Sequence, residues 1–359
     1  MSSREPRPAK ALVPLRYEGA ALQVLDQRLL PDQEHYETLY RAHEVARAIE
    51  SMMIRGAPLI GVAAAYGLAL EARALLRDHE DFFVGLERAC ARLASSRPTA
   101  VNLNRALSLG SPWIRGGMRP ADAAQALLEI AHRLARFEIE ASTRMGQDGA
   151  ARLGPRSRLL THCNTGCLAT LGEGTALAVV RHAFRSGRAE GVTCTETRPW
   201  MQGARLSAFE LAREGWPTEL VTESVAGDRL LNRTFDWFLV GADRISPDGR
   251  VANKAGTHML SQLARIGGAR VMVVAPTTTI DWTWDEAHPA PIEHRDGDEL
   301  WRATGSARIP EGIRIDNPVF DVTPPALIDW IVTERGAIEP ARGEGFDPIR
   351  FGGLPETGS

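Results

Sequence analysis

Hydrophobic residues follow two different periods along the chain. Residues 13–31 alternate apolar and polar positions around a glycine turn, which predicts a β-hairpin. From about 36 to 150 the spacing is that of helices: residues 36–53 repeat every 3.6 positions, and residues 121–141 form a long amphipathic pattern. Residues 59–76 are apolar on nearly every side, so we expect a helix that is buried all round.

After Pro155 the pattern changes to short apolar runs that alternate with helical segments. Alternation of this kind predicts a parallel sheet with helices on both of its faces, because parallel strands need a crossover connection. The runs that we interpret as strands are residues 158–163, 191–197, 218–224, 236–245 and 269–276.

We therefore predict an α/β protein with two domains, for which 359 residues are sufficient. The first is a mainly helical N-terminal domain over 13–150, which starts with a small β-hairpin. The second is a Rossmann-like C-terminal domain with a parallel sheet over 151–340. Residues 1–12, which are rich in Arg and Pro, are expected to be a disordered lead-in, and residues 341–359 a tail.

Composition and charge narrow the classes of function. Apolar residues make up 44% and charged residues 24%, as in ordinary soluble globular proteins. The net charge of −3 gives no reason to expect nucleic acid or an anionic membrane as a partner. No run approaches the roughly 18 apolar residues that a membrane span needs. We therefore expect a cytoplasmic protein that acts on a small molecule.

The cysteines point away from disulfides and metals. Four cysteines in a chain of this length are no disulfide framework, which fits a reducing cytoplasm. Cys163 and Cys167 are four residues apart, but no second Cys/His pair follows at the spacing of a zinc site. The glycine-rich segment 172–177 is not a P-loop. We expect no metal and no cofactor.

The use of lysine is unusual. Lys10 and Lys254 are the only lysines, and Lys10 lies in the predicted lead-in. A chain that uses Arg for almost every positive charge but keeps Lys254 indicates a position where a compact ammonium is needed. Chance retention is the alternative.

Several polar residues follow the predicted strands. In open parallel sheets, ligands bind beyond the carboxyl ends of the strands, so these residues are expected to line one crevice. They are Cys163, Glu196, Asp243 and residues 277–281, with Asn253 and Lys254 shortly after Asp243.

Cys163 and Asp243 are the candidates for acid–base chemistry. A carboxylate at the mouth of an apolar strand is partly desolvated, which raises its pKa and suits proton transfer near neutral pH. Asp243 is equally suited to capping a helix or turn. Cys163 is a candidate acid, base or charge stabiliser, and the alternative is a buried apolar filler.

Three further positions are typical of ligand binding. Arg55, Gly56 and Ala57 precede a buried helix, where free N–H groups and an arginine form a phosphate site; an ordinary helix start is the alternative. Arg97 stands before a proline in a similar position. Gln202 can donate to a hydroxyl or phosphate, or cap the helix that begins near residue 203.

Taken together, several motifs resemble those of the methylthioribose-1-phosphate isomerases, which belong to the superfamily of initiation factor 2B regulatory subunits. The resemblance runs in order from about residue 45 to 335. The motifs are RGAPLIGVAAAYG, RPTAVNL, THCNTG, ETRP, QGARL, GADRI, VANKAGT and APTTTID.

The resemblance implies a role for each matching position. Cys163 and Asp243 fall on the catalytic positions of the family. The substrate-binding positions fall on Arg55, Gly56, Ala57, Arg97, Gln202, Asn253 and Lys254. The implied reaction is the aldose–ketose isomerisation of a sugar 1-phosphate in methionine salvage, without metal or cofactor, in a homodimer.

Alternatives within and outside this family remain. A 5-deoxyribose-1-phosphate isomerase or a ribose-1,5-bisphosphate isomerase would use the same residues, and Arg105 and Arg198 are the candidates for holding a second phosphate. A non-catalytic regulatory subunit of the translation-initiation exchange factor would share the fold, but it would have no need of Cys163 or Asp243.

Overall fold

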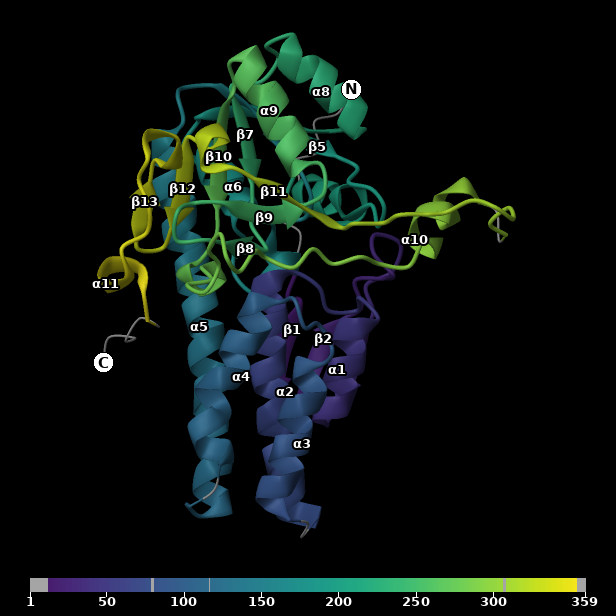
Figure 1. The fold of residues 1–359 in the computed structure, drawn as a ribbon, viewed down its shortest axis with the longest axis vertical. Coiled ribbons are helices and arrows are strands. Elements are labelled where there is room, and N and C mark those ends of the chain that lie inside the picture. The colour runs from purple at the N-terminus through teal and green to yellow at the C-terminus, as the bar shows by residue number, and fades with distance from the viewer. Residues whose placement is uncertain (1–11, 79–80, 116, 306–307, 354–359) are drawn as a thin grey trace, which may run out of the picture.

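The computed structural model describes residues 12–78, 81–115, 117–305 and 308–353. Long helices extend from one end of a large sheet, and a narrow arm that carries helix α10 projects to one side (Figure 1). The predicted lead-in, except residue 12, and residues 354–359 of the predicted tail lie outside the described residues.

The N-terminal strands confirm the predicted hairpin and extend it. β1 (Leu15–Glu18) and β2 (Ala21–Leu25) pair antiparallel. β3 (Tyr36–Leu39) pairs with β2, so the helix predicted over 36–53 was wrong at its start. The pairing places Leu39 opposite Leu22, and both are buried. Pairing with the free edge of β2 therefore overrides the local helical period.

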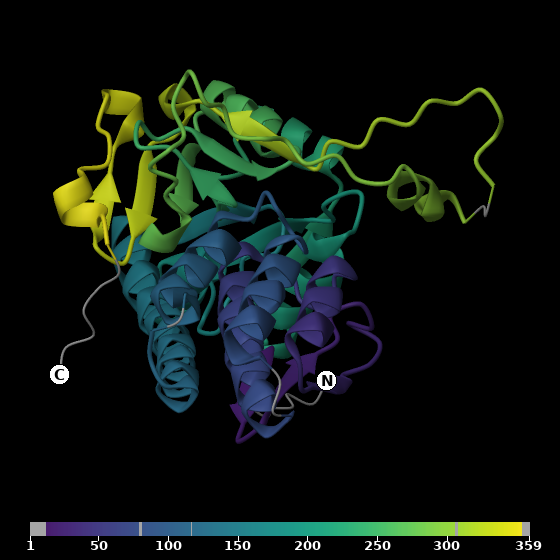
Figure 2. The same cartoon turned by 60° about the horizontal axis from the view of Figure 1, so that its bottom comes forward.

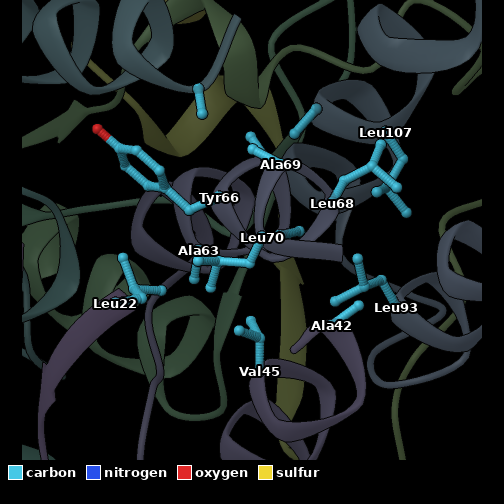
Figure 3. Packing of buried hydrophobic residues seen from close by; sticks show 14 of the residues in the cluster. Leu22, Ala42, Val45, Ala63, Tyr66, Leu68, Ala69, Leu70, Leu93 and Leu107 are labelled. Atoms are coloured by element: carbon cyan, nitrogen blue, oxygen red, sulfur yellow. The ribbon is translucent and has the colours of Figure 1, made fainter. Parts of the chain in front are cut away.

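Among the described residues, five helices form the helical region and confirm the predicted helical pattern. They are α1 (Ala42–Glu50), α2 (Ala57–Asp78), α3 (Phe82–Ala94), α4 (Val101–Ile114) and α5 (Pro120–Arg152). Figure 3 shows Leu68 and Leu70 of α2 at the centre of this core, near Val45 of α1, Leu93 of α3 and Leu107 of α4.

Helix α2 corrects one expectation about composition. Its 22 residues are long and apolar enough to cross a membrane by length and composition, contrary to the expectation that no run approaches a span. However, 83% of its most apolar window is buried inside the protein. Because the other helices surround it, α2 is explained as a core helix.

The large sheet confirms the predicted parallel architecture. Its seven strands lie in the order β13-β12-β10-β7-β4-β5-β6, and only the edge strand β13 runs antiparallel to its neighbour. The strands are β4 (Ser157–Thr161), β5 (Ala189–Thr195), β6 (Thr218–Val221), β7 (Trp237–Val240), β10 (Arg270–Val274), β12 (Trp330–Thr333) and β13 (Gly336–Ile338).

Helices cover both faces of this sheet, as predicted. The C-terminal half of α5 and α6 (Ala176–Arg185) pack on one face, and α8 (Glu223–Leu231) and α9 (Thr257–Gly267) pack on the other. The helix expected from residue 203 starts as the π-helical η2 (Gly203–Ala208) and continues as α7 (Phe209–Arg213).

A third sheet, which is small and antiparallel, and several short helices were not predicted. The small sheet has the order β11-β9-β8 with antiparallel pairs: β8 (Arg244–Ile245), β9 (Val251–Lys254) and β11 (Phe320–Thr323). The short helices are η1 (Cys167–Ala169), η3 (Thr277–Thr279), α10 (Asp298–Trp301), η4 (Arg302–Thr304), η5 (Pro325–Leu327), η6 (Pro340–Arg342) and α11 (Pro348–Phe351).

The described part of the predicted tail, residues 341–353, is packed rather than free. Phe346 and Phe351 are buried, with their rings edge to face at 5.0 Å, in the same core as Ile328 and Ile331. Burial of two aromatic side chains holds this segment on the sheet region. The predicted domain boundary at residue 150 stays a prediction, and α5 runs across it to Arg152.

Candidate active site

A cavity lies between the helical region and the carboxyl end of the large sheet. Its wall takes residues from the start of α2 and the α3–α4 connection on one side, and from the ends of β4, β7 and β9 on the other. The structure thus brings together most of the predicted site residues: Arg55, Gly56, Ala57, Arg97, Cys163, Gln202, Asp243 and Lys254.

Other predicted residues lie elsewhere. Asn253 is not part of the cavity wall; it is buried and donates from its amide to Thr257 Oγ1 at 3.0 Å. Asn253 and Lys254 are adjacent on β9, and neighbouring strand side chains point to opposite faces, so Lys254 alone reaches the cavity. Glu196 and residues 277–281 also lie outside the wall.

The backbone at Cys163 is held in an unusual conformation. Its φ of 70° lies in the left-handed region, which costs a non-glycine residue about 1–3 kcal/mol. Hydrogen bonds hold both sides of the residue: Thr197 Oγ1 accepts from its N–H at 2.9 Å, and Ser207 Oγ donates to its carbonyl at 2.8 Å. The thiol is therefore oriented by its backbone, and Gln202 Nε2 lies 3.4 Å from the sulfur.

A chain of buried hydrogen bonds extends from Cys163 to His162. His162 Nε2 faces the carbonyl of Ala255 at 3.0 Å, which can only accept, so this nitrogen carries the proton. Nδ1 then accepts from Thr195 Oγ1 at 2.7 Å, and Thr195 accepts from Thr197 Oγ1 at 2.9 Å. Burial lowers the pKa of His162 to about 4, so the ring is neutral at physiological pH. Every donor direction in the chain follows from this tautomer.

Asp243 and Lys254 face the same cavity with opposite pKa shifts. Burial raises the pKa of Asp243, against the opposing effect of Lys254, Arg97 and Arg55. Burial lowers the pKa of Lys254 to about 8, and Arg295 and Arg97 add to that effect while Cys163 and Asp243 oppose it. No helix starts at Asp243, since β8 begins at the next residue, so helix capping does not explain this carboxylate.

Arg55 is positioned by a buried network. Its Nη1 donates to Asn164 Oδ1, and Asn164 Nδ2 donates to Glu210 Oε1 at 2.9 Å. Glu210 also accepts from Arg181 at 2.9 Å and from the N–H of Cys167 at 2.8 Å. The network fixes the loop after β4 and holds the Arg55 guanidinium at the cavity wall.

Gly56 allows the chain to pass close to that loop. Its φ is 99°, and a Cβ at this position would lie 2.5 Å from the Cα of Ala169. Helix α2 begins at the next residue, so first-turn N–H groups without helical partners stand beside Arg55. A helix N-terminus next to an arginine favours an anion, as predicted from the sequence.

Gln202 is buried and lines the cavity. Its side chain makes no capping hydrogen bond to η2, so the capping alternative is not what the structure shows. The oxygen Oε1 is buried without a hydrogen-bond partner among the described residues. This oxygen is available to accept from a ligand hydroxyl.

Sequence reasoning missed Arg295 and the residue that holds it. Arg295 lines the cavity, and Glu293 accepts from both Arg295 Nε at 2.7 Å and Arg97 Nη2 at 3.0 Å. These residues lie in a long segment after η3 with no helical or strand period, so position at a strand end could not identify them.

Within the described ranges, no group of three or more His, Cys, Asp or Glu side chains is arranged to hold a metal ion. Cys90, Cys163, Cys167 and Cys194 are all free thiols. The groups available for chemistry in the cavity are therefore a thiol, a carboxyl, an amide and basic side chains.

Comparisons with known proteins identify the family of the chain. The model of the Initiation factor 2 subunit family matches residues 53–340. A methylthioribose-1-phosphate isomerase from Thioalkalivibrio sulfidiphilus is 46% identical over 323 residues, which cover 90% of this chain and 92% of that protein.

Two solved structures have the same fold over nearly the whole chain. The 5-methylthioribose 1-phosphate isomerase from Pyrococcus horikoshii OT3 is 36% identical with a TM-score of 0.82, and covers 94% of this chain and 96% of its own. The translation initiation factor eIF-2B, subunit delta, from A. fulgidus is 34% identical with a TM-score of 0.80, and the match covers 95% of this chain and 99% of that chain. The resemblance found in the sequence is thereby confirmed.

Proposed function

The chain belongs to the initiation factor 2 subunit family, and from that premise we propose that it converts 5-methylthioribose 1-phosphate into 5-methylthioribulose 1-phosphate. This is an aldose–ketose isomerisation, a step of methionine salvage. The observation that carries the proposal is that Cys163, Asp243 and a set of basic side chains line one cavity.

The reaction needs acid–base groups that face each other across the sugar. Phosphate on the anomeric carbon blocks spontaneous opening of the ring, so the enzyme must protonate the ring oxygen and move hydrogen from C2 to C1. Cys163 and Asp243 are the groups we assign to these steps, through either an enediol-like species or a hydride shift. An acid or base of this kind contributes about 10²–10⁴-fold in rate.

The charge of the cavity supports a phosphate monoester. Four basic side chains line the cavity: Arg55, Arg97, Lys254 and Arg295. The carboxylates near them are Asp243 in the wall and Glu293, which accepts hydrogen bonds from Arg97 and Arg295. This leaves a positive surplus that matches a phosphate of about −1.5 to −2 at neutral pH. The phosphate would also meet the N-terminus of α2.

The rest of the wall supports an apolar substituent at C5. Its apolar lining residues are Met52, Ala57, Ile60, Ala100, Trp200 and Phe320. Neither candidate for a second phosphate lies in the wall. Arg105 Nη1 donates to the carbonyl of Thr277, and Arg198 Nη2 to that of Leu300. A methylthio group is therefore a better match than a second phosphate.

The test is turnover of three sugar phosphates side by side: 5-methylthioribose 1-phosphate, 5-deoxyribose 1-phosphate and ribose 1,5-bisphosphate. We expect the highest kcat/KM with the methylthio substrate and the lowest with the bisphosphate. Deuterium at C2 that is retained at C1 of the product indicates a hydride shift, and loss to solvent indicates proton transfer. Preference for the bisphosphate would overturn the assignment of the apolar wall.

A regulatory role is the second candidate, because the A. fulgidus eIF-2B delta subunit shares this fold at 34% identity. A purely regulatory protein needs neither Cys163 nor Asp243 at a common cavity. Absence of turnover with all three sugar phosphates would favour this second candidate.

The partners that we propose are a small sugar phosphate and a second copy of the chain, in the cytoplasm, without nucleic acid or membrane. The net charge of −3 and the four free thiols support this setting. Sedimentation velocity tests the assembly, and a single species at monomer mass would contradict the homodimer.

A further inference from the structure

An arm separates η3 from β11, and its base adjoins the cavity. At the base two segments run antiparallel: the N–H of Arg295 donates to the carbonyl of Asn317, and that of Val319 to the carbonyl of Glu293, both at 3.0 Å. Beyond this pairing, residues 297–305 and 308–316 carry α10 and η4 and project away from the body (Figure 2). Glu293 and Arg295 are thus fixed by backbone hydrogen bonds where the arm joins the protein.

Glu293 connects this base to the opposite wall of the cavity. Its Oε2 accepts from Arg97 Nη2 and from Thr99 Oγ1, both at 3.0 Å, and its Oε1 accepts from Arg295 Nε at 2.7 Å. Although burial raises the pKa of Glu293, Arg97 and Arg295 lower it to about 2. One permanently ionised carboxylate therefore sets the spacing of two guanidinium groups.

The four basic side chains of the cavity outnumber the three carboxylates near them, which are Asp243, Glu293 and Glu299. Glu293 is shared between Arg97 and Arg295, and Glu299 Oε1 forms a longer ion pair with Arg295 Nη1 at 3.5 Å. Arg295 lines the cavity with a side chain that is 13% exposed. Arg295 and Arg97 both act to lower the pKa of Lys254, so these cations repel one another, and a bound anion would relieve that repulsion.

We propose that Arg295 is a substrate-binding residue that contacts the phosphate of the sugar beside Arg97 and Lys254, and that Glu293 is a positioning residue that holds both arginines for it. The inference rests on the proposed function for the identity of the substrate, but not for the binding of phosphate. The purely structural alternative is that Arg295 only secures the base of the arm.

The test compares Arg295→Gln with Arg314→Gln, which removes the same charge from an exposed position on the same arm. We expect Arg295→Gln to raise the KM for 5-methylthioribose 1-phosphate and the Kd for inorganic phosphate by about 10–100-fold, because a charge-assisted hydrogen bond is lost. Arg314→Gln should change both constants less than about twofold, the range of an exposed substitution.

A second pair of measurements separates binding from support of the arm. Arg295→Ala should regain activity when guanidinium ions are added, and an equal concentration of sodium chloride should not restore it. Glu293→Gln should raise KM and Kd less than Arg295→Gln, since both guanidinium groups remain. If Arg295→Gln also lowers Tm, Arg295→Lys replaces it as the test variant, because lysine keeps the positive charge. We expect Arg295→Lys to raise KM by about 3–10-fold, because the bidentate guanidinium is lost.

The outcomes distinguish the two proposals. Unchanged KM and phosphate Kd in Arg295→Gln and Arg295→Ala, or equal changes in Arg314→Gln, would overturn the role of Arg295 and leave the isomerase intact. A defect confined to ribose 1,5-bisphosphate would place Arg295 on the C5 side and overturn it as well. If the wild type turns over none of the sugars, a selective loss of inorganic phosphate binding in Arg295→Gln still supports Arg295 as the phosphate ligand.

Discussion

Gln202 Nε2 lies 3.4 Å from the sulfur of Cys163, and the oxygen of the same amide is buried without a partner among the described residues. The amide therefore faces the thiol with one end and offers the other end to a ligand. We expect Gln202→Met, which keeps the volume but removes the amide, to lower kcat/KM by roughly 10–100-fold. Steady-state kinetics measures this, with Gln262→Met at an exposed site as the control. Equal values for both variants would remove Gln202 from the site.

Asp243 is predicted to carry proton transfer rather than binding. Asp243→Asn keeps the shape but cannot exchange a proton, so kcat should fall by about 10²–10⁴-fold while the Kd of inorganic phosphate stays within about threefold. Asp248→Asn, which changes an exposed carboxylate of the following turn, is the matched control. Turnover of Asp243→Asn near the wild-type rate would contradict the assignment.

Lys254 should set the alkaline limit of the free enzyme. Burial lowers its pKa to about 8, so the ammonium that we propose as a phosphate ligand is lost as the pH rises through that value. We expect kcat/KM to fall above about pH 8. The side chain of Lys254→Arg stays charged throughout this range, so its kcat/KM should not fall above pH 8. Its KM should rise about tenfold, because the planar guanidinium does not replace a compact ammonium. If kcat/KM of Lys254→Arg still falls near pH 8, another group causes that decline.

Thr197 links the backbone of Cys163 to the neutral ring of His162. Thr197→Val keeps the branched shape but removes the hydroxyl, so the N–H of Cys163 loses its acceptor. We expect kcat to fall about tenfold or more, with little change in KM, and the rate at which iodoacetamide modifies Cys163 to change as well. Thr197→Ser, which retains the hydroxyl, should restore both. Failure of Thr197→Ser to do so would show that shape, not hydrogen bonding, matters here.

Glu138 gives the fold a pH-dependent stability. Burial, with the nearby Glu334, raises its pKa to about 8, well above the ordinary glutamate value of 4.5. The folded state therefore keeps a proton that the unfolded state releases, and the free energy of unfolding should fall as the pH rises from about 4.5 to 8. Glu138→Gln cannot ionise, so it should remove this decline, on the order of a few kcal/mol.

Urea unfolding at pH 5 and pH 8.5 tests this expectation. Glu140→Gln, an exposed carboxylate two residues further along α5, is the control and should keep the wild-type slope. If the difference in the free energy of unfolding between the wild type and Glu138→Gln is the same at pH 5 and pH 8.5, the raised pKa of Glu138 is contradicted.

Local sequence pattern determined the parallel sheet, the buried helix α2 and the long helix α5, because alternation and helical period report directly which side of a segment is buried. The position of Cys163 and Asp243 after apolar strands, together with the family motifs, located most of the cavity wall. Lys254 stood out by composition alone. Cys163 and Asp243 follow β4 and β7, which carry both residues to the carboxyl edge of the large sheet, whereas Lys254 ends β9 of the small sheet.

Tertiary structure alone decided the features that depend on distant segments. Residues 36–39 became a strand because β2 had a free edge, and Phe346 and Phe351 were buried because the sheet region left an apolar surface for them. Glu293 and Arg295 reached the cavity through an arm with no periodic pattern. Local periodicity says which face of a segment avoids water, but it does not say which distant segment that face will meet.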